Sequence, residues 1–156
     1  MRRKDKEITD QKIIREILES SEICRLGLVD NNEAYIIPVN FAFHDGSIYI
    51  HSAINGRKME ILKRNNKVAF EMEALTSIIS GPQPCDWTAR YRSVMGKGVI
   101  DIEVNTEQKK QALDLIMKKY GWQNNELVYD DALLLRVCIL KLKIESITGK
   151  QSGDWN

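Results

Sequence analysis

Four residues that could do chemistry gather between positions 51 and 58. An expected strand ends in His51 and Ser52, a turn contains Gly56, and an expected helix opens with Arg57 and Lys58. The first turn of a helix has unpaired N–H groups and the positive end of the helix dipole, so it suits an anion. Cations normally avoid that end. Two adjacent cations there indicate a phosphate lying between them and the backbone donors.

The same cations have a second interpretation, a basic helix face in water. The run continues along the helix with Lys63, Arg64 and Lys67. The residues alone leave the phosphate site and the solvated face both open. A nucleic-acid-binding helix over residues 57–67 is the weakest alternative, because the run has no interleaved aromatic residues on which bases would stack.

Two further segments carry polar groups among apolar ones. Residues 38–41 (PVNF) form part of an expected strand whose backbone N–H and C=O groups can face a flat heterocycle. Residues 91–98 (YRSVMGKG) place Tyr91 and Ser93 on one strand face, and their two glycines permit a close approach or a bend. Each segment, taken alone, also fits an ordinary core strand or a barrel corner.

Several kinds of site are excluded by the motifs that the sequence lacks. It has two histidines, no H-x-x-x-H pattern and no Cys/His cluster, so we expect no metal site. No G-x-S-x-G, Walker or G-x-G-x-x-G motif occurs, which argues against hydrolases, NTPases and Rossmann dehydrogenases. The three cysteines form no C-x-x-C pair, which excludes a thioredoxin-type site.

Length and charge place the chain in a broad class. Its 156 residues suit a single domain, which we expect to span residues 1–156. The 23 Lys and Arg against 22 Asp and Glu give a net charge of +1, which argues against a nucleic-acid-binding protein. The apolar stretches are short and no signal peptide is recognisable, so we expect a cytoplasmic protein without membrane contact.

The candidate residues are expected to be positioned mainly by strands. The expected strands outnumber the expected helices and do not alternate with them regularly. We expect helices over residues 9–20, 56–64 and 106–120, and strands over residues 23–30, 34–43, 47–52, 68–73, 91–104 and 133–148. Residues 74–89 are rich in Gly and Pro and are expected to form a loop. Residues 91–104 are expected to form one long strand, or a strand bent at Gly96 or Gly98. The fold class that follows is mainly β (α+β), a closed or partly closed antiparallel barrel with flanking helices.

The order of the segments resembles one known family. PVNF precedes HSA, a GRK turn and KRN before VAFE, and Y-x-S-V-x-G-x-G follows. Together with MRRKDKEIT and CRLGL, this order resembles the flavin-binding split-barrel proteins related to pyridoxamine 5′-phosphate oxidase. Within that family it is most similar to the nitroimidazole-resistance (Nim) proteins.

The resemblance implies a six-stranded Greek-key split barrel that forms a homodimer, with FMN, or FAD as the alternative, between the subunits. Arg57 and Lys58 would hold the phosphate, and His51 and Ser52 would line the ribityl or phosphate end. The backbone of four residues would border the isoalloxazine ring: Pro38, Val39, Asn40 and Phe41. The strand edge at Tyr91 and Ser93 would close the site, from the other subunit.

The function that the resemblance implies is an oxidoreductase in which an external reductant reduces the flavin and a small acceptor, such as a nitroaromatic, reoxidises it. His51 would act as the catalytic residue near the flavin ring. The chain lacks the C-terminal Arg-containing segment of the vitamin B6 oxidases, which argues against that activity. The alternatives are a non-catalytic flavin-storage protein and a haem-binding split barrel with His51 as axial ligand. Trp155, in a Gly/Ser-bearing tail, is expected to be mobile.

Overall fold

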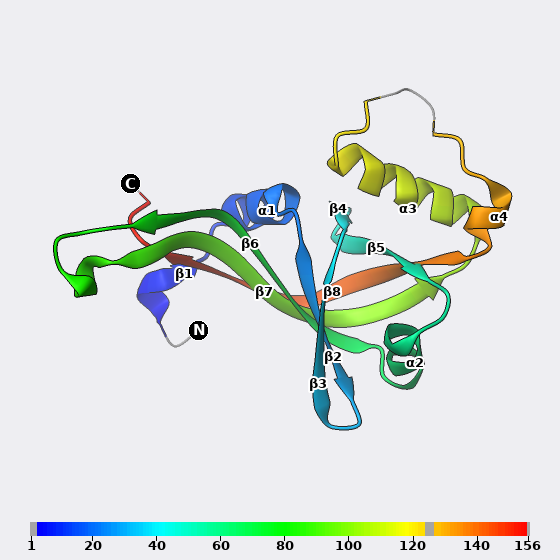
Figure 1. Cartoon of the computed structure of the whole chain (residues 1–156), viewed down its shortest axis with the longest axis horizontal. Helices are drawn as coiled ribbons and strands as arrows, with labels where there is room; N and C mark the ends of the chain where they lie inside the picture. Colours follow the sequence, from blue (N-terminus) through cyan, green and yellow to red (C-terminus); the bar gives the residue numbers. More distant parts are fainter. Residues whose placement is uncertain (1–2, 124–126, 156) are drawn as a thin grey trace.

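The computed structural model describes residues 3–123 and 127–155, and within them the chain forms one antiparallel sheet (Figure 1). The strands are β1 (Glu7–Ile8), β2 (Cys24–Asp30), β3 (Glu33–Val39), β4 (Ala42–His44), β5 (Ser47–Ala53), β6 (Lys67–Ile79), β7 (Thr88–Glu103) and β8 (Val137–Ser152). Their order is β3-β2-β6-β7-β8-β5-β4, and β1 also pairs with β8. The end strands β3 and β4 do not pair, so the sheet stays open.

The helices lie against this sheet. They are α1 (Gln11–Ser20), α2 (Arg57–Arg64), α3 (Thr106–Lys119) and the short α4 (Asp131–Leu134), with 3-10 turns η1 (Lys4–Lys6) and η2 (Pro84–Asp86). Helix α1 packs on β6 and β7 and buries Ile14, Ile17 and Leu18, which recur with helical spacing. Helix α3 packs on β4 and β5. The fold class expected from the sequence, a mainly antiparallel α+β split barrel, is confirmed.

The strand pattern differs from the expected one at three places. The expected strand over residues 34–43 is interrupted between β3 and β4, because the Phe41 N–H donates to a side chain instead of a neighbouring strand. The extra strands beyond the expected six are β4 and the two-residue β1. The last strand begins at Val137 and not at 133, since residues 131–134 form α4, and it continues to Ser152.

The expectation of a loop over residues 74–89 holds only for residues 80–87. Strands β6 and β7 continue as a hairpin to Ile79 and from Thr88, with a bulge between Ala74 and Ser77. The Gly and Pro residues occupy only its turn, where the Trp87 indole N–H donates to the carbonyl of Gly81 at 3.0 Å. We call residues 73–95 the arm. Figure 1 shows it projecting from one side of the sheet, opposite α2, α3 and α4.

Residues 91–104 lie in one long strand, and its pairing with β8 is irregular at the glycines, with a register shift between Lys97 and Gly98. A Cβ atom at Gly98 would lie 2.0 Å from the carbonyl oxygen of Lys143, so only glycine lets the two backbones approach here. This irregularity lies where the barrel passes into the arm. Within the described residues no helix is long and apolar enough to cross a membrane.

Candidate functional site

Strand β5 presents His51 and Ser52 to opposite faces of the sheet. The Ser52 side chain is buried and pairs in register with Cys138, and its hydroxyl lies 3.7 Å from the sulfur of Met59. His51 is exposed and pairs in register with Ile139. Ser52 is therefore fixed by α2 packing and faces the core, whereas His51 is the member of the pair that a ligand can reach.

The turn after β5 prepares the start of α2. Gly56 is the N-cap and has a φ of 111°, a backbone conformation that residues other than glycine rarely adopt. Among residues 3–123 and 127–155, no side chain accepts a hydrogen bond from the first turn of this helix, which carries the exposed acid Glu60. The N-terminal N–H groups of α2 therefore remain available to an anion.

The two cations that open α2 have different surroundings. The Arg57 Nε donates to Asp30 at 3.1 Å, and the guanidinium lies 4.6 Å from the centre of the Tyr35 ring. Arg64 donates to the same carboxylate at 2.8 Å, so two guanidinium groups share one acid. Lys58 has no carboxylate within ion-pair distance in the described part of the chain. A phosphate could thus pair with Lys58 without competition from a carboxylate, whereas at Arg57 it would compete with Asp30.

Lys58 influences the pKa of His51. Burial lowers the pKa of the half-buried Lys58 below its ordinary value. The pKa of His51 is lowered too, by the atoms that shield one side of its otherwise exposed ring from water and by the charge of Lys58. Neutral imidazole is therefore the form of His51 near neutral pH. The unpaired cation and the uncapped helix end fit a phosphate group, which would restore the interaction that Lys58 lacks.

The PVNF segment is half buried and is held by α3. Val39 and Phe41 are buried, whereas Pro38 and Asn40 are exposed, so the latter two are the ones that a ring could contact. The Phe41 N–H donates to the hydroxyl of Tyr120 at 3.2 Å, and that hydroxyl donates to the carbonyl of Glu22 at 2.5 Å. This tyrosine thus fixes the break between β3 and β4.

Lys119 adds a second contact to the same segment. Its ammonium lies 3.7 Å from the centre of the Phe41 ring and donates to the carbonyls of Leu18 and Glu19. Burial lowers its pKa to about 8. Neither Lys119 nor Tyr120 can be recognised as a site residue from the sequence, because helical spacing marks Tyr120 only as a core position and a bond across 79 residues has no local signal.

Tyr91 and Ser93 lie far from these groups within one chain. Ser52 pairs with Cys138 near the start of β8, whereas Ser93 pairs with Lys150 near its end. Twelve residues of strand correspond to about 40 Å at ~3.3 Å per residue. The chain therefore brings together His51, Lys58 and the start of α2, but not the Tyr91–Ser93 edge.

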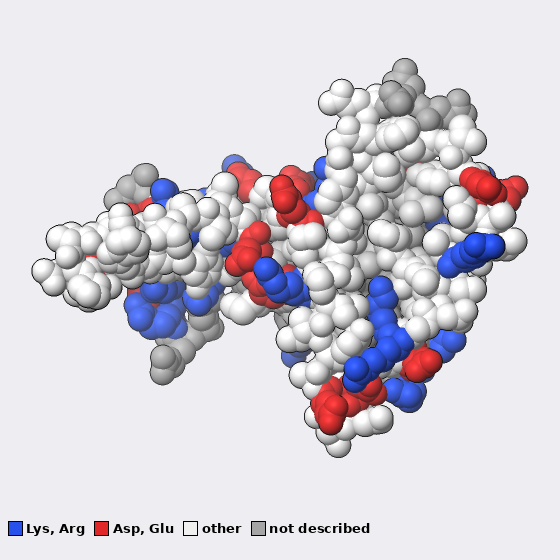
Figure 2. Space-filling view, in the orientation of Figure 1, with Lys and Arg blue, Asp and Glu red and all other residues white. Residues whose placement is uncertain are grey.

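The surface around α2 is open. Figure 2 shows basic and acidic side chains intermixed over α2 and the nearby β2–β3 end, and a visible arm face with few charges. A cavity of about 400 Å³ lies between α3 and strands β4, β5 and β8, and includes Tyr49, Asp114 and Lys141 in its lining. None of the ten residues singled out from the sequence lines it. No group of three or more His, Cys, Asp or Glu side chains in the described residues could hold a metal ion.

Comparison with known proteins gives a family and a fold. Residues 10–151 match the family model described as pyridoxamine 5′-phosphate oxidase. A candidate 5-nitroimidazole antibiotic resistance protein from Bacteroides thetaiotaomicron is 29% identical, with a TM-score of 0.82 over 93% of this chain and 86% of that one. No curated protein matches the sequence.

Two less similar structures share the fold. An FAD and haem binding protein from Mycobacterium smegmatis is 19% identical, with a TM-score of 0.85 over 96% of this chain and 75% of that one. A flavocytochrome from Azotobacter vinelandii is 17% identical, with a TM-score of 0.85 over 99% of this chain and 72% of that one. At these identities the likeness supports the fold alone.

Proposed function

The chain belongs to the pyridoxamine 5′-phosphate oxidase family, and from that premise we propose that it is a flavin-dependent oxidoreductase that binds FMN. The observation that carries the proposal is the start of α2, where uncapped N–H groups follow Gly56 and Lys58 has no carboxylate partner in the described residues. A terminal phosphate monoester, as in FMN, fits a single helix end with one free cation. FAD is the alternative that the resemblance leaves.

The residues of the site divide the work of binding. The N–H groups of α2 and the Lys58 ammonium hold the phosphate. Arg57 contributes less, because its guanidinium is already paired with Asp30. The exposed backbone at Pro38 and Asn40 borders the ring, held in place by the bond from Phe41 to Tyr120. Bound flavin would supply the two-electron redox chemistry. The neutral imidazole of His51 can accept or pass a proton through its ring nitrogens near the reacting groups.

We further propose that the site is completed by a second copy of the chain. The Tyr91–Ser93 edge lies about 40 Å along β8 from Ser52, at the strand spacing of ~3.3 Å per residue, so one chain cannot close its own site with it. Leu75, Ile78 and Trp87, all on the arm, are 60%, 68% and 58% exposed. Such side chains are commonly covered by another molecule. In a homodimer each arm would cover the α2 site of its partner.

The acceptor we propose is a small nitroaromatic compound, with a nicotinamide nucleotide as the reductant. The support is the 29% identity to the candidate 5-nitroimidazole resistance protein. The flavin-storage and haem-binding alternatives predict different spectra and kinetics. Storage predicts bound flavin without turnover, and haem binding predicts a Soret band that is lost in His51→Ala.

One set of measurements tests the proposal. The purified protein should be yellow, release FMN on denaturation, and oxidise reduced nucleotide when a nitroimidazole is added. Lys58→Gln should weaken FMN binding by about 10- to 100-fold, since a charge-assisted bond contributes about 1.5–3 kcal/mol. Lys63→Gln, a cation later in the same helix, should change it less than about twofold. A colourless protein that does not take up FMN would exclude the proposal.

A further inference from the structure

A second cluster of cations lies at the base of the arm, on the face opposite the Tyr91–Ser93 edge. Arg90 and Arg92 alternate along β7 with Tyr91 and Ser93, so their side chains leave the other face of the sheet. Each guanidinium carbon lies 4.2 Å from the centre of the Trp155 ring. The two charges are thus separated by at most about twice that distance, where they repel each other.

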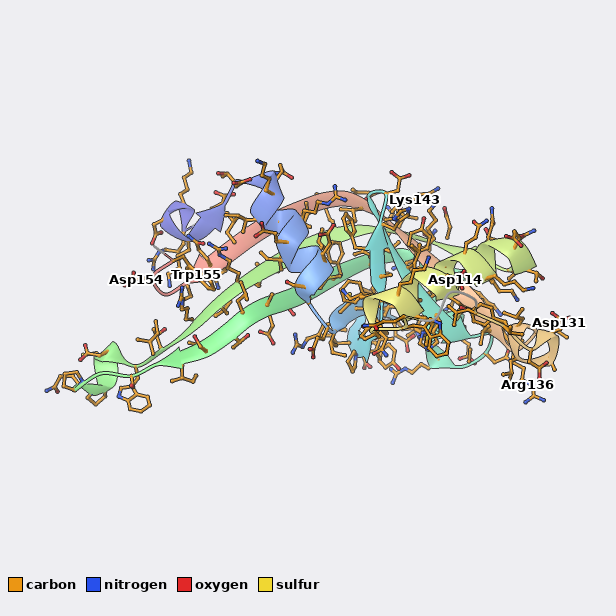
Figure 3. The ribbon with its side chains drawn as sticks, turned by 90° about the horizontal axis from the view of Figure 1, so that it is seen from above. Asp114, Asp131, Arg136, Lys143, Asp154 and Trp155 are labelled. Atoms are coloured by element: carbon orange, nitrogen blue, oxygen red, sulfur yellow. The ribbon has the colours of Figure 1, made fainter. Side chains whose placement is uncertain are left out.

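Trp155 is held in place, contrary to the mobile tail expected from the sequence. Its indole N–H donates to the carbonyl of Ser152 at 2.9 Å, and Gly153, with a φ of 81°, turns the tail back over Arg90. Figure 3 shows Asp154 and Trp155 beyond the end of β8, near η1. The indole therefore fixes the position of both guanidinium groups.

Neither arginine is satisfied by the described part of the chain. Their Nε atoms are buried without a hydrogen-bond partner, and no carboxylate there lies within ion-pair distance of either group. The closest acid along the tail, Asp154, forms no ion pair with them.

We propose that Arg90 and Arg92, fixed by Trp155, form an anion-binding site for the phosphate group of a small molecule. Two guanidinium groups with unpaired donors provide the forked geometry that binds a phosphate in a bidentate manner. An oxyanion there would also offset the repulsion between the two cations. The site lies on the other face of the sheet from the Tyr91–Ser93 edge and does not depend on the flavin proposal.

The test is calorimetric titration of the full chain, loaded with FMN where it binds, with inorganic phosphate. Arg90→Gln/Arg92→Gln should weaken binding at least about tenfold, because both charge-assisted contacts are lost. The matched control is Lys141→Gln/Lys143→Gln, which removes two cations two positions apart on β8, and it should leave the affinity unchanged. If circular dichroism shows that the double variant does not fold, the phosphate affinity of the single variant Arg92→Gln is measured instead.

Two further readouts place the binding. In a Trp87→Phe/Trp122→Phe background, where Trp155 is the sole indole, phosphate should change its fluorescence. Lys58→Gln, altered at the α2 site, should retain the binding whether or not it takes up flavin. Equal affinity in the arginine and lysine double variants, or unchanged Trp155 fluorescence on saturation, would overturn the proposal.

Discussion

The barrel and the arm differ in how far their polar groups are paired and their apolar side chains are buried. In the barrel, Asp30 pairs with two guanidinium groups beside α2, and Tyr120, at the end of α3, pairs with both the Phe41 N–H and the Glu22 carbonyl. On the arm, apolar side chains are exposed and two arginines have no acidic partner in the described residues. Apart from Lys58 and the first N–H groups of α2, these polar groups of the barrel pair within the chain, whereas the exposed apolar side chains and the two arginines of the arm have no such partners in the described residues.

Removing the apolar side chains of the arm should have the largest effect. Leu75→Glu/Ile78→Glu would place charges in the proposed subunit contact, and we expect a dimer to become a monomer in size-exclusion chromatography with light scattering. FMN binding should weaken by at least about 30-fold, as for a contact contributing about 2 kcal/mol. Thermal stability of the barrel should change little, because both side chains are exposed.

The matched control is Leu133→Glu/Leu135→Glu, which charges two exposed apolar residues at α4. It should leave the oligomeric state and FMN binding unchanged. A protein that stays dimeric with a charged arm, or that is monomeric and binds FMN fully before any change, would contradict the assignment of the arm to the subunit contact.

A smaller effect is expected at the end of α3, where the polar groups pair within the chain. Tyr120→Phe would leave the Phe41 N–H and the Glu22 carbonyl without their partner, at a cost of about 1–2 kcal/mol in the free energy of unfolding. Urea denaturation measures this cost. Tyr129→Phe removes a single bond to Asp114 and should cost less. Equal effects of the two changes would show that Tyr120 does not hold the β3–β4 break.

The smallest expected effect is a dependence on pH. The pKa of Lys119 is about 8 in the folded chain, against 10.5 for an exposed lysine. Between these values the unfolded chain binds more protons, so this group makes the free energy of unfolding rise with pH. Lys119→Met should flatten the pH dependence between about pH 8 and pH 9.5. An unchanged slope in that range would indicate that Lys119 is solvated and not buried against Phe41.

The sequence predicted the elements whose residues repeat with a regular period. Ile14, Ile17 and Leu18 mark one face of α1, and the alternation after Val137 marks β8. Asp10, a residue type favoured at a helix start, is the N-cap of α1, and its side chain accepts from the Lys12 N–H. These features depend on neighbours along the chain, so local patterns contain the information.

Local sequence patterns did not predict the arm or the contacts within the site. Ile78 and Ile79 favour a strand, but Gly81, Pro82 and Pro84 favour a loop and were given more weight. Apolar residues are expected to be buried, and a single chain offers nothing that would bury a projecting hairpin. The bond between Asp30 and Arg57 joins residues 27 positions apart. Residue type identified Arg57 as a cation at a helix start, but only the folded chain shows the acid that it meets.

The pairing of β8 has a consequence for the order in which the chain can fold during synthesis. This strand pairs with β1, β5 and β7, yet it follows the β4–β5 hairpin by more than 80 residues. At translation rates of ~5–20 residues per second, β5 waits several seconds for its neighbour. Its apolar residues Ile48 and Ile50 are unprotected meanwhile, so a nascent chain stalled before Val137 should be the form that chaperones bind and proteases cut.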